Sequence, residues 1–222
     1  MIERKFVKEK VKEFEIQEYI DETLTNVGHA YTRLFRTPLG EKIVIYTSRP
    51  GLVVGKKGEN IKKLTTTLKK RFGLENPQLE IAEIENPNTN PTIVAERISS
   101  SLERFGIQRF KAIAHRTMAD VNDAGAQGVE ITISGKVPSS RARTWRFHTG
   151  HIEKCGNMAT EKMGAAYSTA YLKSGAVGIT VRITPPDLKL PDALTIIEEQ
   201  EVKDEKEGAK EPAAKRAEKD AE

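Results

Sequence analysis

Apolar positions recur at helical spacing over residues 3–27, with charged residues between them. They form two successive stripes: Phe6, Val7, Val11 and Phe14, then Ile16, Tyr19, Ile20 and Leu24. Because residues three and four apart share one face of a helix, this pattern predicts two amphipathic helices, or one helix broken near Glu15. We expect both stripes to pack in the core.

The period of the pattern then changes to two, which is typical of β-strands. Residues 30–36 and 42–47 alternate as strands, and Pro38 and Gly40 supply the turn of a hairpin between them. A short helix, a glycine-containing loop, a long helix over residues 59–72 and a third strand over residues 78–84 follow.

Six turn-forming residues, Asn-Pro-Asn-Thr-Asn-Pro at 86–91, separate these elements from a second set. The second set has helices over residues 92–105 and 110–124 and strands over residues 128–134, 144–148 and 176–184. We expect a second α+β domain, in which two helices precede an antiparallel or mixed sheet. The predicted division is a first domain at 1–85, a linker at 86–91, a second domain at 92–190 and a disordered acidic tail at 191–222.

Composition indicates an intracellular protein without membrane contact. Of the 222 residues, 37% are hydrophobic and 31% charged, and no run approaches the roughly 18 apolar residues of a membrane span. The charged N-terminus differs from a signal peptide. Cys155 is the single cysteine, which excludes an internal disulfide and a zinc knuckle.

Charge is unevenly distributed along the chain. Residues 197–222 contain ten acidic and six basic residues, and because the whole chain carries a formal net charge of +4, the remainder carries +8. A basic body with an acidic tail predicts that the body binds a polyanion.

The loop before the long helix reads Gly55-Lys56-Lys57-Gly58, with two valines in front of it and an isoleucine behind. Glycines three apart let the backbone turn tightly and approach another molecule, and the lysines place positive charge at the point of approach. Such Gly-x-x-Gly loops in KH domains clamp about four nucleotides of a single strand. The loop and the element order predict an RNA-binding type II KH domain, whose three-stranded sheet supports helices on one face.

Other phosphate-binding loops do not fit this stretch. A Walker A loop needs four residues between its glycines and then Lys and Ser or Thr, whereas Gly58 is followed by Glu59. A dinucleotide-binding loop needs a third glycine and another spacing. A plain helix–helix turn with a solvated lysine pair accounts for Gly58 but not for the apolar residues on both sides.

The second domain has basic residues around the start of its second helix and after its first strand: Arg109, Lys111, His115 and Arg116, then Arg141, Arg143 and Arg146. Because the planar guanidinium of arginine binds two phosphate oxygens at once, this set predicts RNA contact. The alternative is a charged surface with local ion pairs. A lone tryptophan in an alternating segment, Trp145, is more typical of core than of base stacking.

No catalytic residue, metal site or cofactor is predicted. His148 and His151 are three apart, but only Glu153 and Cys155 lie near them as further metal-type ligands, without the spacing of a zinc site. No Ser-His-Asp order or nucleotide loop stands out. We therefore expect a binding protein and not an enzyme.

Two separated segments resemble one family. They are Gly-Leu-Val-Val-Gly-Lys-Lys-Gly-Glu-Asn-Ile-Lys-Lys-Leu-Thr from residue 51, followed by Lys-Lys-Arg-Phe-Gly, and Gly-Ala-Gln-Gly-Val-Glu-Ile-Thr-Ile-Ser-Gly-Lys from residue 125. Both look like protein three of the small ribosomal subunit (the universal S-three family) of the archaeal type. The resemblance covers roughly residues 3–190.

This resemblance implies a structural protein of the subunit head, at the outer end of the channel where mRNA enters, which helps to open messenger structure. The implied partners are small-subunit ribosomal RNA, mRNA and neighbouring head proteins, with no membrane or small-molecule substrate, and the implied location is the cytoplasm, in the small subunit. Matched residue by residue, the family's adjacent basic pair falls on Lys111 and Ala112, and a further basic residue on His115, followed by Arg116. Ala112 departs from the pattern, and we expect Arg109 to supply part of the missing charge.

Two other classes of function are weighed against this one. The first is a free-standing KH-domain regulator or RNA chaperone. The second is a nucleic-acid-cleaving repair enzyme, which needs a reactive carboxylate or lysine for which the sequence offers no site.

Overall fold

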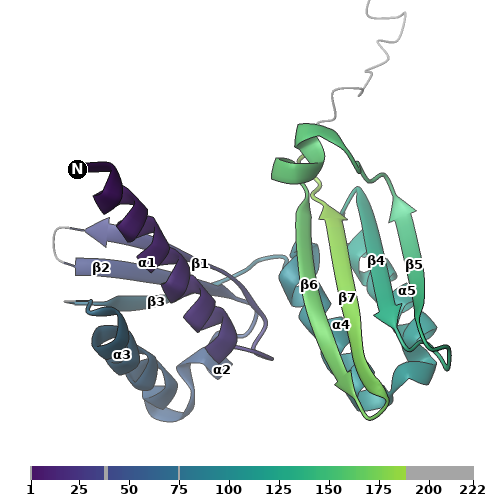
Figure 1. Cartoon of the computed structure of the whole chain (residues 1–222), viewed down its shortest axis with the longest axis horizontal. Helices are drawn as coiled ribbons and strands as arrows, with labels where there is room; N and C mark the ends of the chain where they lie inside the picture. Colours follow the sequence, from purple (N-terminus) through teal and green to yellow (C-terminus); the bar gives the residue numbers. More distant parts are fainter. Residues whose placement is uncertain (1, 38–39, 75, 189–222) are drawn as a thin grey trace, which may run out of the picture. The chain divides into compact units, whose positions relative to one another are not determined.

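Two α+β domains make up the part of the chain that the computed structural model describes, which is residues 2–37, 40–74 and 76–188 (Figure 1). The first contains α1 (Ile2–Thr23), β1 (His29–Thr37), β2 (Gly40–Thr47), α2 (Pro50–Val54), η1 (Lys56–Gly58), α3 (Glu59–Phe72) and β3 (Gln78–Glu83). The second contains η2 (Pro87–Thr89), α4 (Pro91–Phe105), η3 (Ile107–Arg109), α5 (Phe110–Asp123), β4 (Gly128–Gly135), β5 (Arg143–Gly150), η4 (Met158–Lys162), β6 (Gly164–Leu172) and β7 (Gly175–Thr184). The predicted turn residue Pro38 and the predicted tail at 191–222 lie outside the described residues.

The first sheet has the strand order β1-β2-β3, with β1 and β2 antiparallel and β2 and β3 parallel. Helices and strands share one buried core, which is formed by Ile16, Ile20, Leu24, Ile43, Ile45, Val53, Leu64, Leu68 and Leu74. Parallel strands need a crossover connection, and α2, η1 and α3 supply it, so the glycine–lysine loop lies within the crossover. The predicted three-stranded sheet with helices on one face is confirmed.

α1 is one continuous helix of 22 residues, so both predicted alternatives, two helices or one helix broken near Glu15, are wrong. Its second apolar stripe lies in the core, where Ile16 and Ile20 are fully buried. The first stripe is 50–64% exposed over Phe6, Val7, Val11 and Phe14. The prediction that it packs in the core is wrong, because the sheet and α3 cover only the C-terminal half of the helix.

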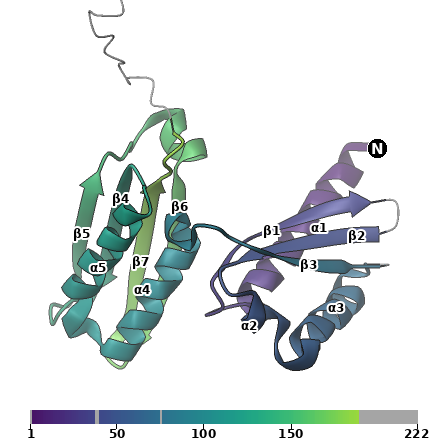
Figure 2. The same cartoon turned by 180° about the vertical axis from the view of Figure 1, so that it is seen from behind.

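The second sheet has the order β5-β4-β7-β6, and all its neighbouring strands are antiparallel. Its inward side chains pack with α4 and α5 in a second core, including Val129, Ile131, Ile133, Val177, Ile179, Val181 and Ile183. Figure 1 views this sheet with both helices behind it, and Figure 2 views it with both helices in front. The predicted arrangement of two helices followed by a sheet is confirmed.

The helices are amphipathic, as α4 illustrates. Its predicted apolar face is buried, with Ile93, Val94, Ile98 and Leu102 at most 4% exposed. The helix begins after Asn90, whose side chain accepts a hydrogen bond from the backbone N–H of Thr92, which satisfies one of the unpaired donors of the first turn. In the described residues, no helix is both long and apolar enough to cross a membrane.

β6 lies in a stretch for which no strand was predicted. Its inward positions are small, since Ala166 and Ala170 are the buried side chains, whereas its outward positions include the exposed Tyr167 and Tyr171. In this strand the small side chains are buried and the large ones are exposed. The usual strand pattern, in which large apolar residues face inward, is therefore absent.

α4 closes the outer edge of β6 with two side-chain hydrogen bonds. Ser99 Oγ donates to the carbonyl oxygen of Thr169 at 3.1 Å, and the backbone N–H of Tyr171 donates to Glu103 Oε1 at 2.9 Å. Strand groups that would otherwise lack partners at the edge of the sheet are thereby satisfied.

Candidate nucleic-acid interface

The glycine–lysine loop connects α2 to α3, and its two glycines have conformations that other residues rarely adopt. Gly55 has φ 70° and ψ −177°, a region restricted almost entirely to glycine, and a Cβ on it would lie 2.6 Å from Asn60 Nδ2. Gly58 is left-handed, with φ 74° and ψ 21°. Asn60 Nδ2 also donates to the carbonyl oxygen of Leu52 at 3.3 Å, so the first turn of α3 is tied to α2 across the loop.

Positive charge and the start of a helix meet at this loop. Lys56 and Lys57 are exposed, and neither forms an ion pair within the described residues. The N-terminus of α3 follows directly, where unpaired N–H groups and the helix dipole favour an anion. The carboxylate of Glu59 is balanced by Lys63, whose hydrogen bond at 2.6 Å lowers the pKa of that carboxyl.

Below the loop, apolar side chains fix its position. Val53 is fully buried, and Leu64 and Leu68 of α3 pack in the same core. The loop backbone is therefore held by the domain while its lysines reach solvent, an arrangement suited to contact with a ribose-phosphate chain.

A second basic surface lies where α5 begins beside β5. Lys111 Nζ lies 4.8 Å from the centroid of the Trp145 ring, and the guanidinium carbon of Arg143 lies 4.7 Å from it. A ring face attracts cations, so two of the predicted basic residues contact the ring of Trp145. The indole is half-buried and packs on Phe110 at 5.5 Å, in keeping with the core position predicted for it.

The other predicted residues of this surface are less tightly placed. The His115 ring meets Phe147 edge-on at 5.2 Å, and Arg109 lies 5.9 Å from the ring of Phe105. Arg116 is exposed on α5, and Arg141 is exposed in the connection between β4 and β5. Arg109, Lys111, His115 and Arg116 thus share one helix start, as predicted.

Arg146 lies on the opposite face of the sheet from Arg143 and is not part of that surface. Its Nε is 2.8 Å from Glu130 Oε1, and Lys154 Nζ approaches the same oxygen at 3.4 Å. Arg182 lines a depression together with Glu130 and Arg146. The sequence prediction did not include Lys154 or Arg182, although the alternation over residues 176–184 indicates that Arg182 faces outward.

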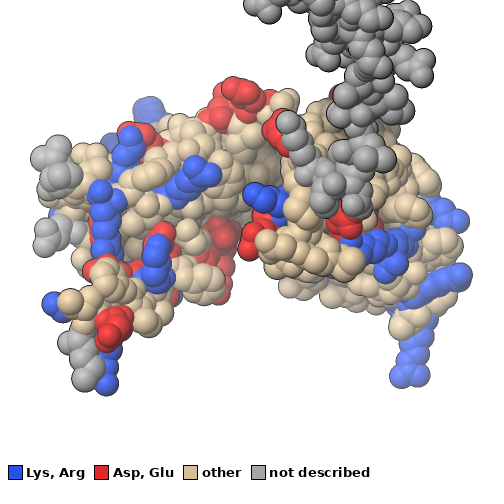
Figure 3. Space-filling view, turned by 90° about the horizontal axis from the view of Figure 1, so that it is seen from above, with Lys and Arg blue, Asp and Glu red and all other residues tan. Residues whose placement is uncertain are grey.

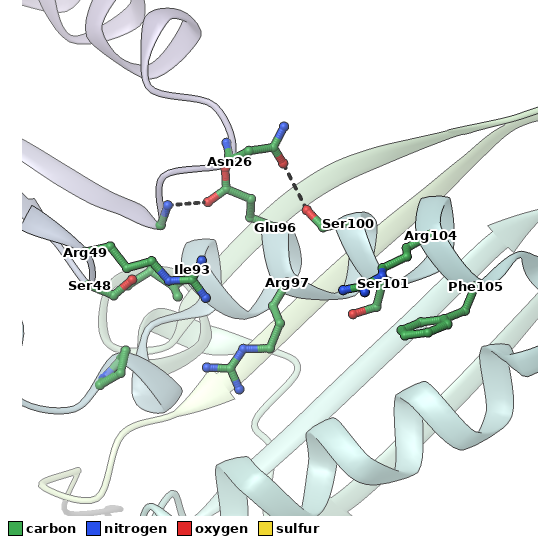
Figure 4. A pocket seen from close by; sticks show the side chains of 12 residues that line it. Asn26, Ser48, Arg49, Ile93, Glu96, Arg97, Ser100, Ser101, Arg104 and Phe105 are labelled. Carbon is green, nitrogen blue, oxygen red and sulfur yellow. Dashed lines mark hydrogen bonds between the residues drawn. The ribbon is translucent and has the colours of Figure 1, made fainter. Parts of the chain in front are cut away.

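A cavity of about 380 Å³ carries three more arginines, Arg49, Arg97 and Arg104 (Figure 4). Arg97 is engaged by Asn88 Oδ1 at 2.7 Å and by Asp120 at 3.5 Å. Some other polar groups of the wall are also paired.

The carboxylate of Glu96 is one of these paired groups. It accepts hydrogen bonds from the backbone N–H groups of Asn26 and Gly28, and Ser100 Oγ donates to Asn26 Oδ1. Burial raises the pKa of Glu96. These interactions hold the turn after α1, and we assign no ligand to the cavity.

The residues weighed as a metal pair do not converge. His151 is paired with Glu153 at 3.0 Å, and His148 is exposed on β5. Over residues 2–37, 40–74 and 76–188, no group of three metal-type side chains comes together.

In the second domain, drawn at the right of Figure 3, Lys and Arg side chains are spread over the visible face and few Asp or Glu side chains appear. The long-range field of such a surface favours a polyanion.

Comparison with known proteins gives two family matches and several relatives. A family model described as KH domain matches residues 15–89, and one described as Ribosomal protein S3, C-terminal domain, matches residues 98–183. Small ribosomal subunit protein uS3 of Methanocaldococcus jannaschii is 43% identical over 203 residues, covering 91% of this chain and 97% of that protein. The chain belongs to the uS3 family.

Further uS3 proteins agree with this membership. Those of Methanococcus maripaludis and Methanobrevibacter smithii are each 42% identical over 197 residues, covering 89% of this chain and 92% and 78% of the relatives. The relatives are archaeal, so both the family and the archaeal type predicted from the sequence are confirmed. In this uS3 chain, the first family match contains the glycine–lysine loop, and the second contains the basic start of α5.

Proposed function

We propose that this chain is a structural constituent of the small ribosomal subunit in the cytoplasm, where it binds ribosomal RNA through the glycine–lysine loop. The observation that carries the proposal is the geometry of Gly55 and Gly58, which exposes bare backbone and two lysines on a firmly packed support in a chain of the uS3 family. Binding through phosphates is electrostatic and largely independent of sequence.

The basic start of α5 is the second part of the proposal. We assign to Arg109, Lys111, His115 and Arg116 contact with mRNA at the entry channel, with Arg143 beside Lys111 on the Trp145 ring. This surface has no nucleotide-binding loop beside it to supply energy. It therefore keeps incoming mRNA single-stranded by holding strands that have already separated.

The loop is tested by reversing its charge. With Lys56→Asp/Lys57→Asp we expect single-stranded RNA to bind the full chain at least about 25-fold more weakly at 0.1 M salt, because two phosphate contacts are lost. The slope of log K against log salt should become shallower by roughly 1.4, at about 0.7 per phosphate. Fluorescence anisotropy with a labelled oligonucleotide measures both quantities.

The matched control is Lys69→Asp/Lys70→Asp, which makes the same charge change in the last turn of α3. It changes only the long-range field, so we expect a smaller loss of affinity and an unchanged slope. If the two variants show the same loss of RNA affinity and the same salt slope, the loop does not contact RNA.

A free-standing KH regulator is the competing function. Sedimentation of cell extract separates the two, because a subunit constituent stays with the small subunit after a moderate salt wash, whereas a regulator is released.

A further inference from the structure

The four-stranded sheet has one face covered by α4 and α5, and within the described residues no helix lies in front of its other face (Figure 1). The residues that point to this open face are Glu130, Thr132, Ser134, Thr144, Arg146, His148, Ala165, Tyr167, Thr169, Tyr171, Gly178, Thr180 and Arg182. Apart from Ala165, Gly178 and Glu130 they are hydroxyl, basic and aromatic residues, and in the described residues Glu130 is the single carboxylate of the set.

Two tyrosines of β6 are the largest exposed groups of this face. Tyr167 and Tyr171 are 75% and 76% exposed. They are four residues apart on the same side of one strand, so their attachment points are about 13 Å apart. Within the described residues neither ring stacks on another aromatic ring. Both are therefore available to a partner on the open face.

The cations beside Tyr167 are held in place by a buried group. Glu130 is 4% exposed and binds Arg146 through Nε, while the side chain of Arg146 remains 60% exposed. Because Nε is engaged and the side chain is exposed, the terminal N–H groups of the guanidinium can still donate hydrogen bonds to a phosphate. Lys154, 55% exposed, is held by the same oxygen.

Glu130 also has an unused acceptor. In the part of the chain that the structure describes, its Oε2 is buried and has no hydrogen-bond partner. A buried acceptor without a donor costs free energy.

Two shallow depressions meet at Tyr167. One, of about 200 Å³, is lined by Glu130, Arg146, Tyr167 and Arg182 among others. The other, of about 250 Å³, is lined by Lys154, Tyr167 and Arg182 among others. The exposed ring therefore stands between two hollows, each of which has cations in its wall.

We propose that the open face of this sheet is a further binding site for single-stranded RNA, with bases stacked on Tyr167 and Tyr171 and phosphates held by Arg146, Lys154 and Arg182. A sheet whose exposed aromatic rings stack bases is an established way of binding single strands. Within the described residues, the walls of the two depressions hold three cations, Arg146, Lys154 and Arg182, and two carboxylates, Glu130 and Glu153, which leaves one net positive charge.

RNA fits this face better than a protein does. The core of a protein interface is apolar and depleted of charge, whereas here Tyr167 lies beside Thr180, Arg182 and Lys154. The site is separate from the two surfaces of the proposed function, although it rests on that function in that the chain meets RNA in the subunit.

The test compares Tyr167→Ala/Tyr171→Ala with the parent full chain. We expect the affinity for a labelled, unstructured 12-nucleotide RNA to fall by about five-fold to a hundred-fold, the range measured for loss of a stacked base. Tyr167→Phe/Tyr171→Phe should restore most of the affinity, because the phenyl ring still stacks. Thr169→Ala, between the tyrosines on the same face, is the matched control and should bind as the parent does.

Photo-crosslinking of the parent to RNA that contains 4-thiouridine gives an independent readout, with cross-linked peptides expected within β6 and β7. Unchanged affinity of the alanine variant together with no cross-link to these strands would overturn the proposal. If RNA affinity is unchanged but the variant no longer stays with the small subunit, the face binds a protein, and the proposal also fails.

This result is distinguishable from failure of the loop proposal, which depends on the Lys56 and Lys57 variant alone. If that variant binds RNA normally while the tyrosine variant does not, the loop proposal fails and the sheet site stands.

Discussion

Gly55 and Gly58 differ in why each position of the loop favours glycine. Gly55 occupies a conformation almost closed to other residues, and a Cβ there would also meet Asn60. Gly58 is left-handed with open space where a Cβ would project. A side chain at Gly58 therefore costs only the left-handed backbone, about 1–2 kcal/mol, whereas one at Gly55 also displaces the contact that ties α3 to α2.

We expect His29 to make the stability of the first domain dependent on pH. The side chain is buried, with Nε2 2.9 Å from Thr32 Oγ1 and Nδ1 3.1 Å from Asp21. Burial lowers the pKa of His29 and outweighs the opposite effect of Asp21, whose own pKa is raised by burial. We take burial as the deciding cause, because the His29 ring is almost fully enclosed.

The sign of the effect follows from proton binding. Below the ordinary histidine pKa of about 6.5, the unfolded chain takes up a proton that folded His29 resists, so stability is lost as the pH falls. Between pH 7 and pH 5.5 we expect the free energy of unfolding to fall, by at most about 1.4 kcal/mol per pH unit from this group. The raised pKa of Asp21 acts with opposite sign, chiefly at lower pH. Denaturant titrations at several pH values measure the slope.

His29→Gln is the variant that isolates this contribution. It keeps a polar side chain but cannot titrate, so its slope over the same range should be shallower than that of the parent. Parallel slopes would mean that another group is responsible.

For Trp145, the position in the core could be predicted from the sequence, but its contacts could not. Its core position was predictable from the alternating segment in which it lies, and the basic character of Lys111 and Arg143 was evident from composition. Their meeting on one ring was not predictable, because it depends on how α5 packs beside β5.

At the scale of elements, periodicity predicted α3, α4, α5 and all strands except β6, whereas it divided or broke the continuous helix α1. It succeeds where large apolar residues face a core, as in β4 and β7. It fails in β6, where alanines face inward and tyrosines outward. It also cannot say whether an apolar helix face will be covered, which is why the first half of α1 was placed in the core.

The two halves of α1 should respond differently to substitution. Ile20 is fully buried and Phe14 is 63% exposed. We expect Ile20→Ala to lower the free energy of unfolding by about 2–5 kcal/mol, because it leaves a cavity. Phe14→Ser should change it by less than about 0.5 kcal/mol. Denaturant unfolding of the purified chain measures both, and a large loss with Phe14→Ser would show that this face is covered in the free protein.

At the scale of the whole molecule, basic residues from distant parts of the sequence form separate surfaces. Sequence alternation indicates which side of a strand Arg146 and Arg182 occupy, but the order β5-β4-β7-β6 decides that they share a face with Glu130. The division of the chain at residues 86–91 stays a prediction.

The α5 surface gives a prediction for the assembled ribosome. With Lys111→Ala/Arg116→Ala we expect slower translation through a stable mRNA hairpin and unchanged speed on an unstructured message, because fewer cations hold the separated strand. Single-turnover translation of matched messages measures the difference. The control Lys5→Ala/Lys8→Ala removes the same charge from α1 and should leave both translation rates unchanged. If ribosomes with the parent chain, the α5 variant and the α1 control all translate through the hairpin at the same rate, the assignment is contradicted.

The two hydrogen bonds from α4 to β6 have a consequence before assembly. An open strand border invites another copy to add its own strand, the first step towards aggregation. Ser99 and Glu103 occupy part of that border. We therefore expect a newly synthesised chain to be protected at this edge from pairing with other copies before it is assembled into a ribosomal subunit.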